Sequence, residues 1–319
     1  MLLLKIVLVI IIAVVILYIA GSVYYFRLAT VGRDVSKIDD GTESGYTPKG
    51  WESSFDAIVS DGRICFDQTD FEEVEVESFD GLKLRGLLKT VPNSNGTLIF
   101  MHGYRSTPRH DFSGLFPFFS SFGYNMLFPF QRAHGRSEGK YITFGVRERK
   151  DAVRWCEFIN NKQGYQQNIF MIGISMGCTT VVMGAGSGYP DNVRGVIADC
   201  GYTSPKEIIK SVARKLIPVE FLIKPFVFSV DFLCKHFAGF SLSEYSTLDA
   251  LSNTELPILF IHGEDDDFVP CEMTSENHRS YKGKKNLLLV PGASHAVSCI
   301  VDNENYKKNV IQFINENSN

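Results

Sequence analysis

Residues 173–177, Gly-Ile-Ser-Met-Gly, constrain this chain most, because they join an apolar run to a helical pattern through a sharp turn. The run 168–172 is typical of a buried strand, and 178–185 is typical of a helix. A serine at such a turn has a strained backbone, and flanking glycines leave room for the closely packed helix. The five-residue pattern alone arises by chance, so its weight comes from this context. The sequence predicts that Ser175 projects at the carboxyl edge of a sheet.

Short apolar runs that alternate with helical patterns continue on both sides of this turn. Ahead of them, 72–78 and 82–88 alternate with period two around Asp80-Gly81, which is typical of a β-hairpin. Apolar strands alternating with helices indicate a parallel sheet covered on both faces. The sequence therefore predicts an α/β fold with a predominantly parallel eight-stranded sheet and helices on both faces. The six apolar strands expected are 97–101, 124–128, 168–172, 193–198, 257–261 and 286–290.

A long insertion separates the strands that end at Asp199 and begin at Pro257. Its central part, 204–240, is rich in apolar residues and carries six Lys/Arg against three Asp/Glu. These features favour a small helical lid over a binding site, at about residues 203–247. An ordinary crossover with one extra helix is the alternative.

The first 27 residues differ from the rest, since 6–26 form an uncharged apolar run. As a helix this run would span roughly 31 Å, close to the ~30 Å hydrocarbon core of a bilayer. We expect a single-pass membrane anchor at 1–27, a connector at 28–70 and a catalytic domain at 71–319. A cleaved signal peptide is the alternative, because Ala-Gly-Ser at 20–22 forms a weak cleavage site. The excess of Lys and Arg after the run favours a cytoplasmic catalytic domain.

Composition excludes several other classes of protein. The net charge of −4 gives no electrostatic reason to expect nucleic acid as a partner. The seven cysteines are widely spaced and form no Cys-x-x-Cys pair, which argues against a disulfide framework. We expect no metal or organic cofactor. The sequence does not predict an oligomeric state.

The residues that would activate Ser175 follow it in the chain. A serine hydroxyl needs a base, and His295 lies in the small-residue loop after the last expected strand. The orienting acid should lie between them, where 265–267 offers three aspartates after the strand 257–261. This pattern leaves the choice among the three open, with Asp199 at the end of an earlier strand as a further possibility.

An acyl-transfer site also needs backbone N–H groups that stabilise an oxyanion. The first is expected to be the amide of Met176, directly after the serine. The second should come from the loop 102–105, where Gly103 permits a tight turn, and we choose the amide of Tyr104.

From about Phe71 onward the sequence resembles the α/β-hydrolase superfamily, in its serine-aminopeptidase-like and membrane-anchored esterase-like branch. The family places its acid four residues after the histidine of a His-Gly pair, here His262, which selects Asp266 in this sequence. The sequence departs from the family's pattern in one block, because Phe130 stands where the family has an acid. We expect this difference to affect loop packing more than catalysis. The matched blocks are 102–104, 173–177, 262–266 with 269–270, and 292–295.

The resemblance and the residues together imply a serine hydrolase with Ser175, Asp266 and His295 as its triad. An apolar insertion and a membrane tether favour a small-molecule ester with a lipophilic acyl chain. A serine peptidase of aminopeptidase type is the enzymatic alternative. A non-catalytic ligand-binding protein on the same fold is the second alternative, against which the complete set of three residues argues.

Overall fold

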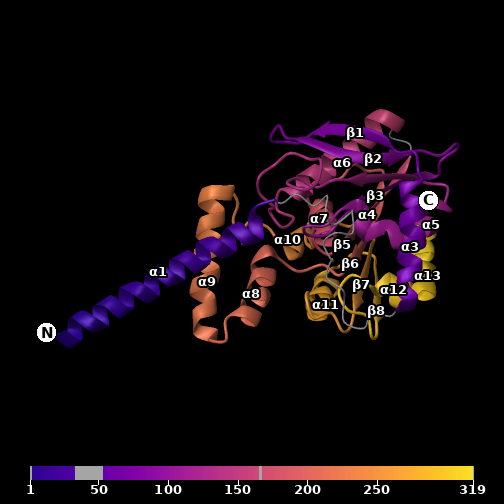
Figure 1. Cartoon of the computed structure of the whole chain (residues 1–319). Helices are drawn as coiled ribbons and strands as arrows, with labels where there is room; N and C mark the ends of the chain where they lie inside the picture. Colours follow the sequence, from indigo (N-terminus) through magenta and orange to yellow (C-terminus); the bar gives the residue numbers. More distant parts are fainter. Residues whose placement is uncertain (1, 33–52, 165–166, 319) are drawn as a thin grey trace.

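The computed structural model describes residues 2–32, 53–164 and 167–318, and an eight-stranded sheet forms their centre (Figure 1). The strand order is β1-β2-β4-β3-β5-β6-β7-β8. β1 and β2 pair antiparallel, β2 joins β4 antiparallel, and the remaining neighbours are parallel. The predicted sheet is therefore confirmed. The strands are β1 (Glu72–Glu77), β2 (Lys83–Lys89), β3 (Gly96–Met101), β4 (Asn125–Pro129), β5 (Asn168–Ile174), β6 (Val193–Asp199), β7 (Ile258–Gly263) and β8 (Lys285–Val290).

Alternate residues of each central strand enter different apolar cores. In β3, Leu98 and Phe100 face one core while Ile99 and Met101 face the other, as the period of two requires. The first core is covered by α3 (Ser53–Asp67), α4 (Pro108–Phe112), α5 (Phe116–Ser120), α12 (Ser298–Val301) and α13 (Asn303–Asn317). The second is covered mainly by α6 (Glu148–Gln163), α7 (Met176–Ala185), α10 (Thr247–Leu251) and α11 (Cys271–Ser280).

Helix α3 falls within 28–70, the range expected to be a connector. It packs against the short 3-10 turn Ser113–Leu115 and against α5, and Phe66 is buried in the first core. A Cβ at Gly62 would lie 1.9 Å from the carbonyl oxygen of Ser113, so this glycine permits the close approach. The helix is therefore part of the domain, whereas residues 33–52 lie outside the described residues.

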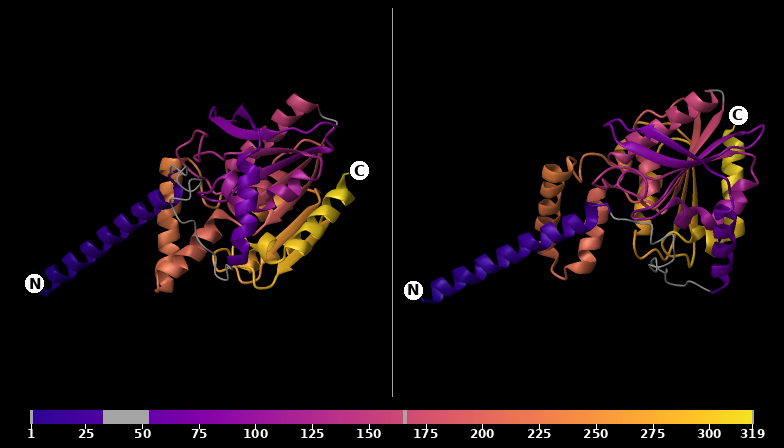
Figure 2. Two further views of the ribbon diagram at one scale, coloured as in Figure 1. Left: turned by 45° about the vertical axis from the view of Figure 1, so that its right-hand side comes forward. Right: turned by 45° about the horizontal axis from the view of Figure 1, so that its top comes forward.

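Helix α1 (Leu2–Thr30) projects from the domain, but its last turns are built into it (Figures 1 and 2). Ser22, Tyr25, Phe26, Ala29 and Thr30 are buried. Tyr25, Phe26 and Ala29 join a third apolar core with the insertion, which forms α8 (Pro205–Leu216), α9 (Glu220–Leu233) and a π-helical turn (Cys234–Ala238). The helix thus passes three residues beyond the expected end of the anchor at residue 27 and ends inside the folded domain.

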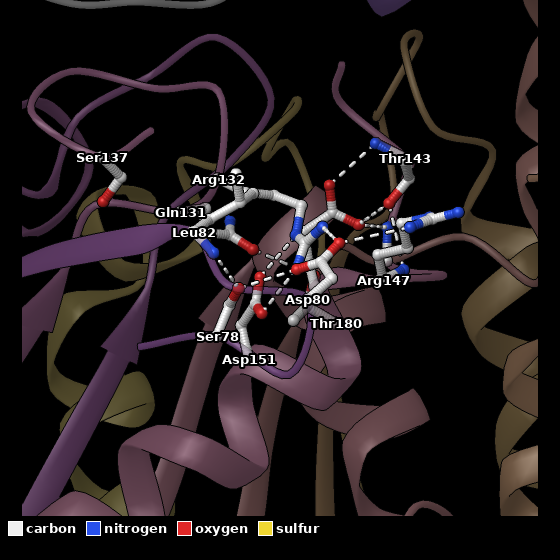
Figure 3. A network of polar contacts seen from close by, with 12 residues as sticks. Ser78, Asp80, Leu82, Gln131, Arg132, Ser137, Thr143, Arg147, Asp151 and Thr180 are labelled. Atoms are coloured by element: carbon white, nitrogen blue, oxygen red, sulfur yellow. Dashed lines mark hydrogen bonds and ion pairs between the residues drawn. The ribbon is translucent and has the colours of Figure 1, made fainter. Parts of the chain in front are cut away.

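An ion-pair network centred on the buried Arg132 ties the β1–β2 hairpin to α6 (Figure 3). The Arg132 guanidinium donates to Asp151 from Nε and Nη2 at 2.6 and 2.7 Å, and to Asp80 from Nη1 and Nη2 at 2.9 and 3.0 Å. Burial opposes ionisation of Asp80, but hydrogen bonds from Arg132 and Ser78 together with the charges of Arg132 and Arg147 outweigh this and lower the pKa to about 2. Such paired charges fix the loop that contains Phe130, which is itself buried.

The packing of α1 predicts how far the chain can be shortened. Deleting residues 1–17 should leave the stability of the domain unchanged, because every described side chain there is exposed. Deleting 1–27 removes Tyr25 and Phe26 from the third core and should lower the free energy of unfolding by about 3 kcal/mol or more. Urea unfolding of both proteins in the same detergent measures the difference. Equal midpoints would mean that these rings do not support the fold.

Candidate active site

Ser175 occupies the turn between β5 and α7 with φ 56° and ψ −116°, a strained conformation for a residue other than glycine. Close packing on both sides holds it there. A Cβ at Gly173 would lie 2.3 Å from the Gly177 carbonyl oxygen, and one at Gly177 would lie 1.8 Å from that of Met101. Only glycine fits at either position, so the two glycines allow α7 to begin directly beneath β3 and present the serine.

His295 lies between Ser175 and Asp266. Its Nε2 is 2.9 Å from Ser175 Oγ, and its Nδ1 is 2.7 Å from Asp266 Oδ2. These residues come from three separate elements, the β5–α7 turn, the loop after β7 and the loop after β8. The Phe268 ring packs edge-on against the imidazole at 5.0 Å between centroids. The structure therefore brings together the three side chains that the sequence predicted as a triad.

Asp266 is the aspartate of its run that turns inward, while Asp265 and Asp267 are exposed. Its Oδ1 accepts the N–H groups of Phe268 and Val269 at 2.9 and 2.8 Å. Burial opposes its ionisation, but hydrogen bonds from two histidines outweigh that and hold its pKa well below the usual range. The carboxylate is therefore ionised at neutral pH.

The second histidine on Asp266 is His262, whose role the sequence did not reveal. Its Nε2 lies 3.0 Å from Asp266 Oδ2, and its Nδ1 lies 2.7 Å from the Thr274 hydroxyl. It occupies the end of β7, four residues before the aspartate, and is completely buried. The spacing of four residues between His262 and Asp266 was the sequence signal that could have indicated this contact.

Asp199, the other candidate acid, lies at the end of β6 and is buried. Burial raises its pKa to about 6, and His295 Nδ1 is hydrogen-bonded to Asp266 instead. Asp199 instead contributes its carbonyl oxygen, which accepts the Ser175 N–H at 2.9 Å. The backbone of Asp199 therefore helps to hold Ser175 in its turn.

The loop after β3 lies beside the serine. A Cβ at Gly103 would come 3.3 Å from Ser175 Cβ, which places the Gly103–Tyr104 peptide next to the hydroxyl. The Gly103 N–H donates to Asp111 Oδ2 at 2.6 Å. Met176 is the first residue of α7, so its N–H is one of the helix N-terminal donors that have no intrahelical acceptor. Both backbone groups chosen from the sequence therefore belong to segments adjoining Ser175.

The side chains of Tyr104 and Arg105 in this loop bind the end of α1. The Tyr104 hydroxyl donates to the Ala29 carbonyl at 2.8 Å, and its ring stacks on Phe144 at 5.6 Å. Arg105 Nη2 donates to the Val31 carbonyl at 3.1 Å and also to that of Leu28. The end of α1 is thereby fastened to the loop beside the serine.

His102 and His134, whose rings lie 4.9 Å apart, support the same loop as neutral groups. His102 Nε2 accepts the Gln131 N–H at 3.0 Å, and His134 Nε2 accepts the Arg105 N–H at 2.9 Å. Burial lowers the pKa of both, that of His134 to about 3. They are structural residues.

A pocket of about 900 Å³ opens at Ser175 and His295. Its apolar wall comes from α3, β5 and the region of α12, through Val59, Ile64, Ile174 and Ile300, among others. Its polar rim includes Arg63, Arg105, Arg109 and Asp111. The volume suits a small organic ligand.

The insertion expected as a lid does not line this pocket. Among the described residues none of its lining side chains comes from 203–247, because α9 packs against α1 and α8 packs against α9 instead. The wall that a lid was expected to supply comes partly from α3, which Arg109 joins to the rim by a two-point ion pair with Asp67 at 2.6 Å.

Cys200, Asp266 and His295 are the described residues whose potential metal-ligand atoms lie within 4.8 Å of one another. Burial raises the pKa of the Cys200 thiol well above its usual range, and both carboxylate oxygens of Asp266 already accept hydrogen bonds. A metal would require a thiolate and free lone pairs. This donor set therefore fits a hydrogen-bonded relay better than a cation.

Among known proteins, the chain is similar in fold to solved structures of hydrolases. No family model matches it. The uncharacterised Bacillus subtilis protein YqkD is 28% identical over 251 residues, which cover 78% of this chain and 81% of YqkD. The Pyrococcus furiosus esterase Pf2001 superposes with a TM-score of 0.64 at 23% identity, covering 86% of this chain and all of the esterase. The Pyrococcus horikoshii acylaminoacyl peptidase gives 0.57 at 16%, covering 81% of this chain and 43% of the peptidase.

The hydrogen bonds of Asp266 predict a pH-dependent contribution to stability. In Asp266→Asn the side-chain NH₂ faces either two histidine donors or two backbone donors, so the variant should lose about 2 kcal/mol at neutral pH. Because the folded-state pKa lies below the ordinary value of about 3.9, this advantage of the wild type is complete above that value. It shrinks as the pH falls toward the folded-state pKa.

Urea midpoints measured from pH 7 to pH 3 for the wild type and Asp266→Asn follow this difference. Asp265→Asn is the matched control, since its exposed carboxylate adjoins the same loop, and it should track the wild type throughout. A gap between wild type and Asp266→Asn that widened on acidification would contradict the assignment.

Proposed function

We propose that this protein, which has the α/β-hydrolase fold, is a serine hydrolase that transfers the acyl group of a carboxylic ester to water. The observation that carries the proposal is the continuous relay from Ser175 Oγ through His295 to Asp266, with distances of 2.9 and 2.7 Å. Nucleophile, base and orienting acid within hydrogen-bond reach are what acyl transfer by a serine requires.

In the proposed reaction His295 Nε2 accepts the proton of Ser175 Oγ as that oxygen bonds to the ester carbonyl carbon. As negative charge develops on the carbonyl oxygen, this oxygen accepts hydrogen bonds from the backbone N–H groups of Tyr104 and Met176. Collapse of the tetrahedral species breaks the bond to the alcohol oxygen, which takes the proton from His295. Water then attacks the acyl-serine with His295 as base, releasing the acid and restoring Ser175.

Asp266 keeps the imidazole in the tautomer that presents Nε2 to the serine and stabilises the imidazolium that forms. His262 and two backbone amides hold the carboxylate in place, so His295 need not reorganise it during proton transfer. This arrangement supplies orientation and charge balance without a metal or organic cofactor.

The pocket supports an ester with an apolar acyl chain as the substrate. Val59, Ile64 and Ile300 give it an apolar wall, while arginines lie at its rim. The esterase Pf2001 among the structural neighbours is named for the same chemistry. An apolar acyl chain against α3 with the ester carbonyl at Ser175 places the reacting bond where the relay lies.

The proposal includes retention of α1 as a single-pass membrane anchor with the catalytic domain on the cytoplasmic side. The helix is long and apolar enough to cross a membrane. Cleavage at 20–22 would cut a continuous helix whose next turns, Ser22 to Thr30, are built into the domain. That packing supports an uncleaved segment, and the Lys/Arg excess after the apolar run supports the orientation.

The triad predicts non-additive losses of activity. Ser175→Ala, His295→Ala and the double variant should each lower kcat for p-nitrophenyl butyrate by a similar factor, of order 10⁴ or more, because the residues act as one unit. Initial rates measure the loss of kcat, and equal unfolding midpoints show that the variants are folded like the wild type. Retention of full activity by Ser175→Ala would exclude the mechanism.

The pocket predicts the preferred substrate. p-Nitrophenyl esters of increasing acyl length should give kcat/KM rising from acetyl to octanoyl, as the chain fills the apolar wall. Ile64→Asp, which places a charge on that wall, should remove the preference for long chains while acetyl hydrolysis persists. Aminoacyl anilides run in parallel test the aminopeptidase alternative, and faster cleavage of anilides than of every ester would favour it instead.

A further inference from the structure

Helix α9 presents a face of exposed aromatic side chains that the catalytic site does not use. Phe221, Phe228 and Phe232 are 76%, 72% and 59% exposed. Their spacings of seven and four residues place them on one side of the helix, while Phe226 and Val230 on the opposite side are buried in the third core. Contiguous exposed apolar surface of this kind marks an interaction site.

The helix that carries this aromatic face packs against α1, which is long and apolar enough to cross a membrane. In all three views of Figures 1 and 2, α9 runs across α1 where α1 leaves the domain. The Tyr25 and Phe226 rings lie 5.1 Å apart, and the Tyr18 and Ser229 hydroxyls lie 3.5 Å apart. Phe237, 56% exposed, packs against Phe26 at 6.0 Å. The two helices are thus packed together, and the exposed ring of Phe237 lies where the insertion meets α1.

From this arrangement we infer that α9 lies in the interfacial layer of the membrane that α1 crosses, with Phe221, Phe228 and Phe232 inserted among the lipid acyl chains. The inference rests on the proposed retention of α1 as an anchor. It adds a second membrane contact, made by the insertion itself, and names lipid as the occupant of the aromatic face.

The length of α1 supports this position. The helix meets α9 at Tyr18, so the freely projecting part, 2–17, is roughly 24 Å long at 1.5 Å per residue. That is shorter than the ~30 Å hydrocarbon core. An interfacial helix lies with its apolar face about 5–10 Å into the boundary. If α9 sits at that depth, the projecting part of α1 reaches across the remaining hydrocarbon.

Charge around the aromatic face fits the surface of an anionic leaflet. Residues 204–240 carry six Lys/Arg against three Asp/Glu, a net charge of +3 before histidine. Lys210, Arg214 and Lys235 form exposed or partly exposed ion pairs with the three acids. The remaining cations, Lys206, Lys215 and Lys224, supply the excess charge, and each basic group near such a surface contributes about 1 kcal/mol.

The contacts of α1 with the active-site loop make the arrangement rigid. The Tyr104 hydroxyl and the Arg105 guanidinium hold the carbonyl oxygens of Ala29 and Val31. α1 is therefore fixed at one end to the loop beside Ser175 and along its side to α9. Insertion of α9 would hold the catalytic domain at one orientation on the bilayer instead of letting it swing on a tether.

The test uses the full chain carrying Phe228→Trp, reconstituted in phosphatidylcholine–phosphatidylglycerol vesicles whose lipids are brominated along the acyl chains. Bromine quenches tryptophan only at close range, so quenching reports contact with the hydrocarbon. The wild-type chain, with Trp51 and Trp155, provides the background to subtract. Ile311→Trp is the matched control, because Ile311 is also an exposed apolar helical residue, 39% exposed, but lies on α13.

We expect brominated lipid to lower the added fluorescence of Phe228→Trp at least twofold and to leave that of Ile311→Trp unchanged, with both proteins floating with the vesicles. If both variants float with the vesicles and neither is quenched, the inference is overturned while the anchor stays in place. Absent quenching together with crosslinking of α9 between two chains would assign the face to a second copy and likewise overturn it. Failure of the full chain to float would overturn the anchor and, with it, the inference.

Discussion

The close contact of α7 with β3 is the constraint on which the rest of the site depends. With no side chain at Gly177, the helix starts against the Met101 carbonyl, where a Cβ would lie only 1.8 Å away. That approach sets Ser175 beside the Gly103–Tyr104 peptide and opposite His295. The strained backbone of the serine is tolerated because its N–H is bound by the Asp199 carbonyl and its flanks are packed. The fold itself thereby holds Ser175, His295 and the Gly103–Tyr104 peptide beside one another.

The parts of the structure that the sequence predicted are those encoded by short-range patterns. Apolar runs gave all the parallel strands, and the turn at 173–177 gave the position of Ser175. The choice of Asp266 needed the resemblance, because local sequence does not distinguish three consecutive aspartates. The structure does distinguish them, since the middle one turns toward two histidines and two backbone amides.

The parts that were not predicted depend on contacts between distant segments. Helix α3 has apolar residues at helical spacing, Phe55, Ile58, Val59 and Phe66, so its existence could be read from the sequence. Its role as a pocket wall could not, because that requires knowing that it packs beside Ser113. For the same reason the insertion looked like a lid, whereas its apolar residues cover the end of α1. The aromatic face left exposed on α9 then belongs to the part of the molecule around α1 rather than to the pocket.

Active-site labelling can show whether Ser175 is the activated nucleophile that we propose. The full-length protein is treated with a fluorophosphonate, digested and analysed by mass spectrometry. We expect one adduct per chain, on the peptide containing Ser175, formed at a rate that drops sharply in His295→Ala. A folded wild-type protein that stayed unlabelled, or that carried its adduct on another residue, would contradict it.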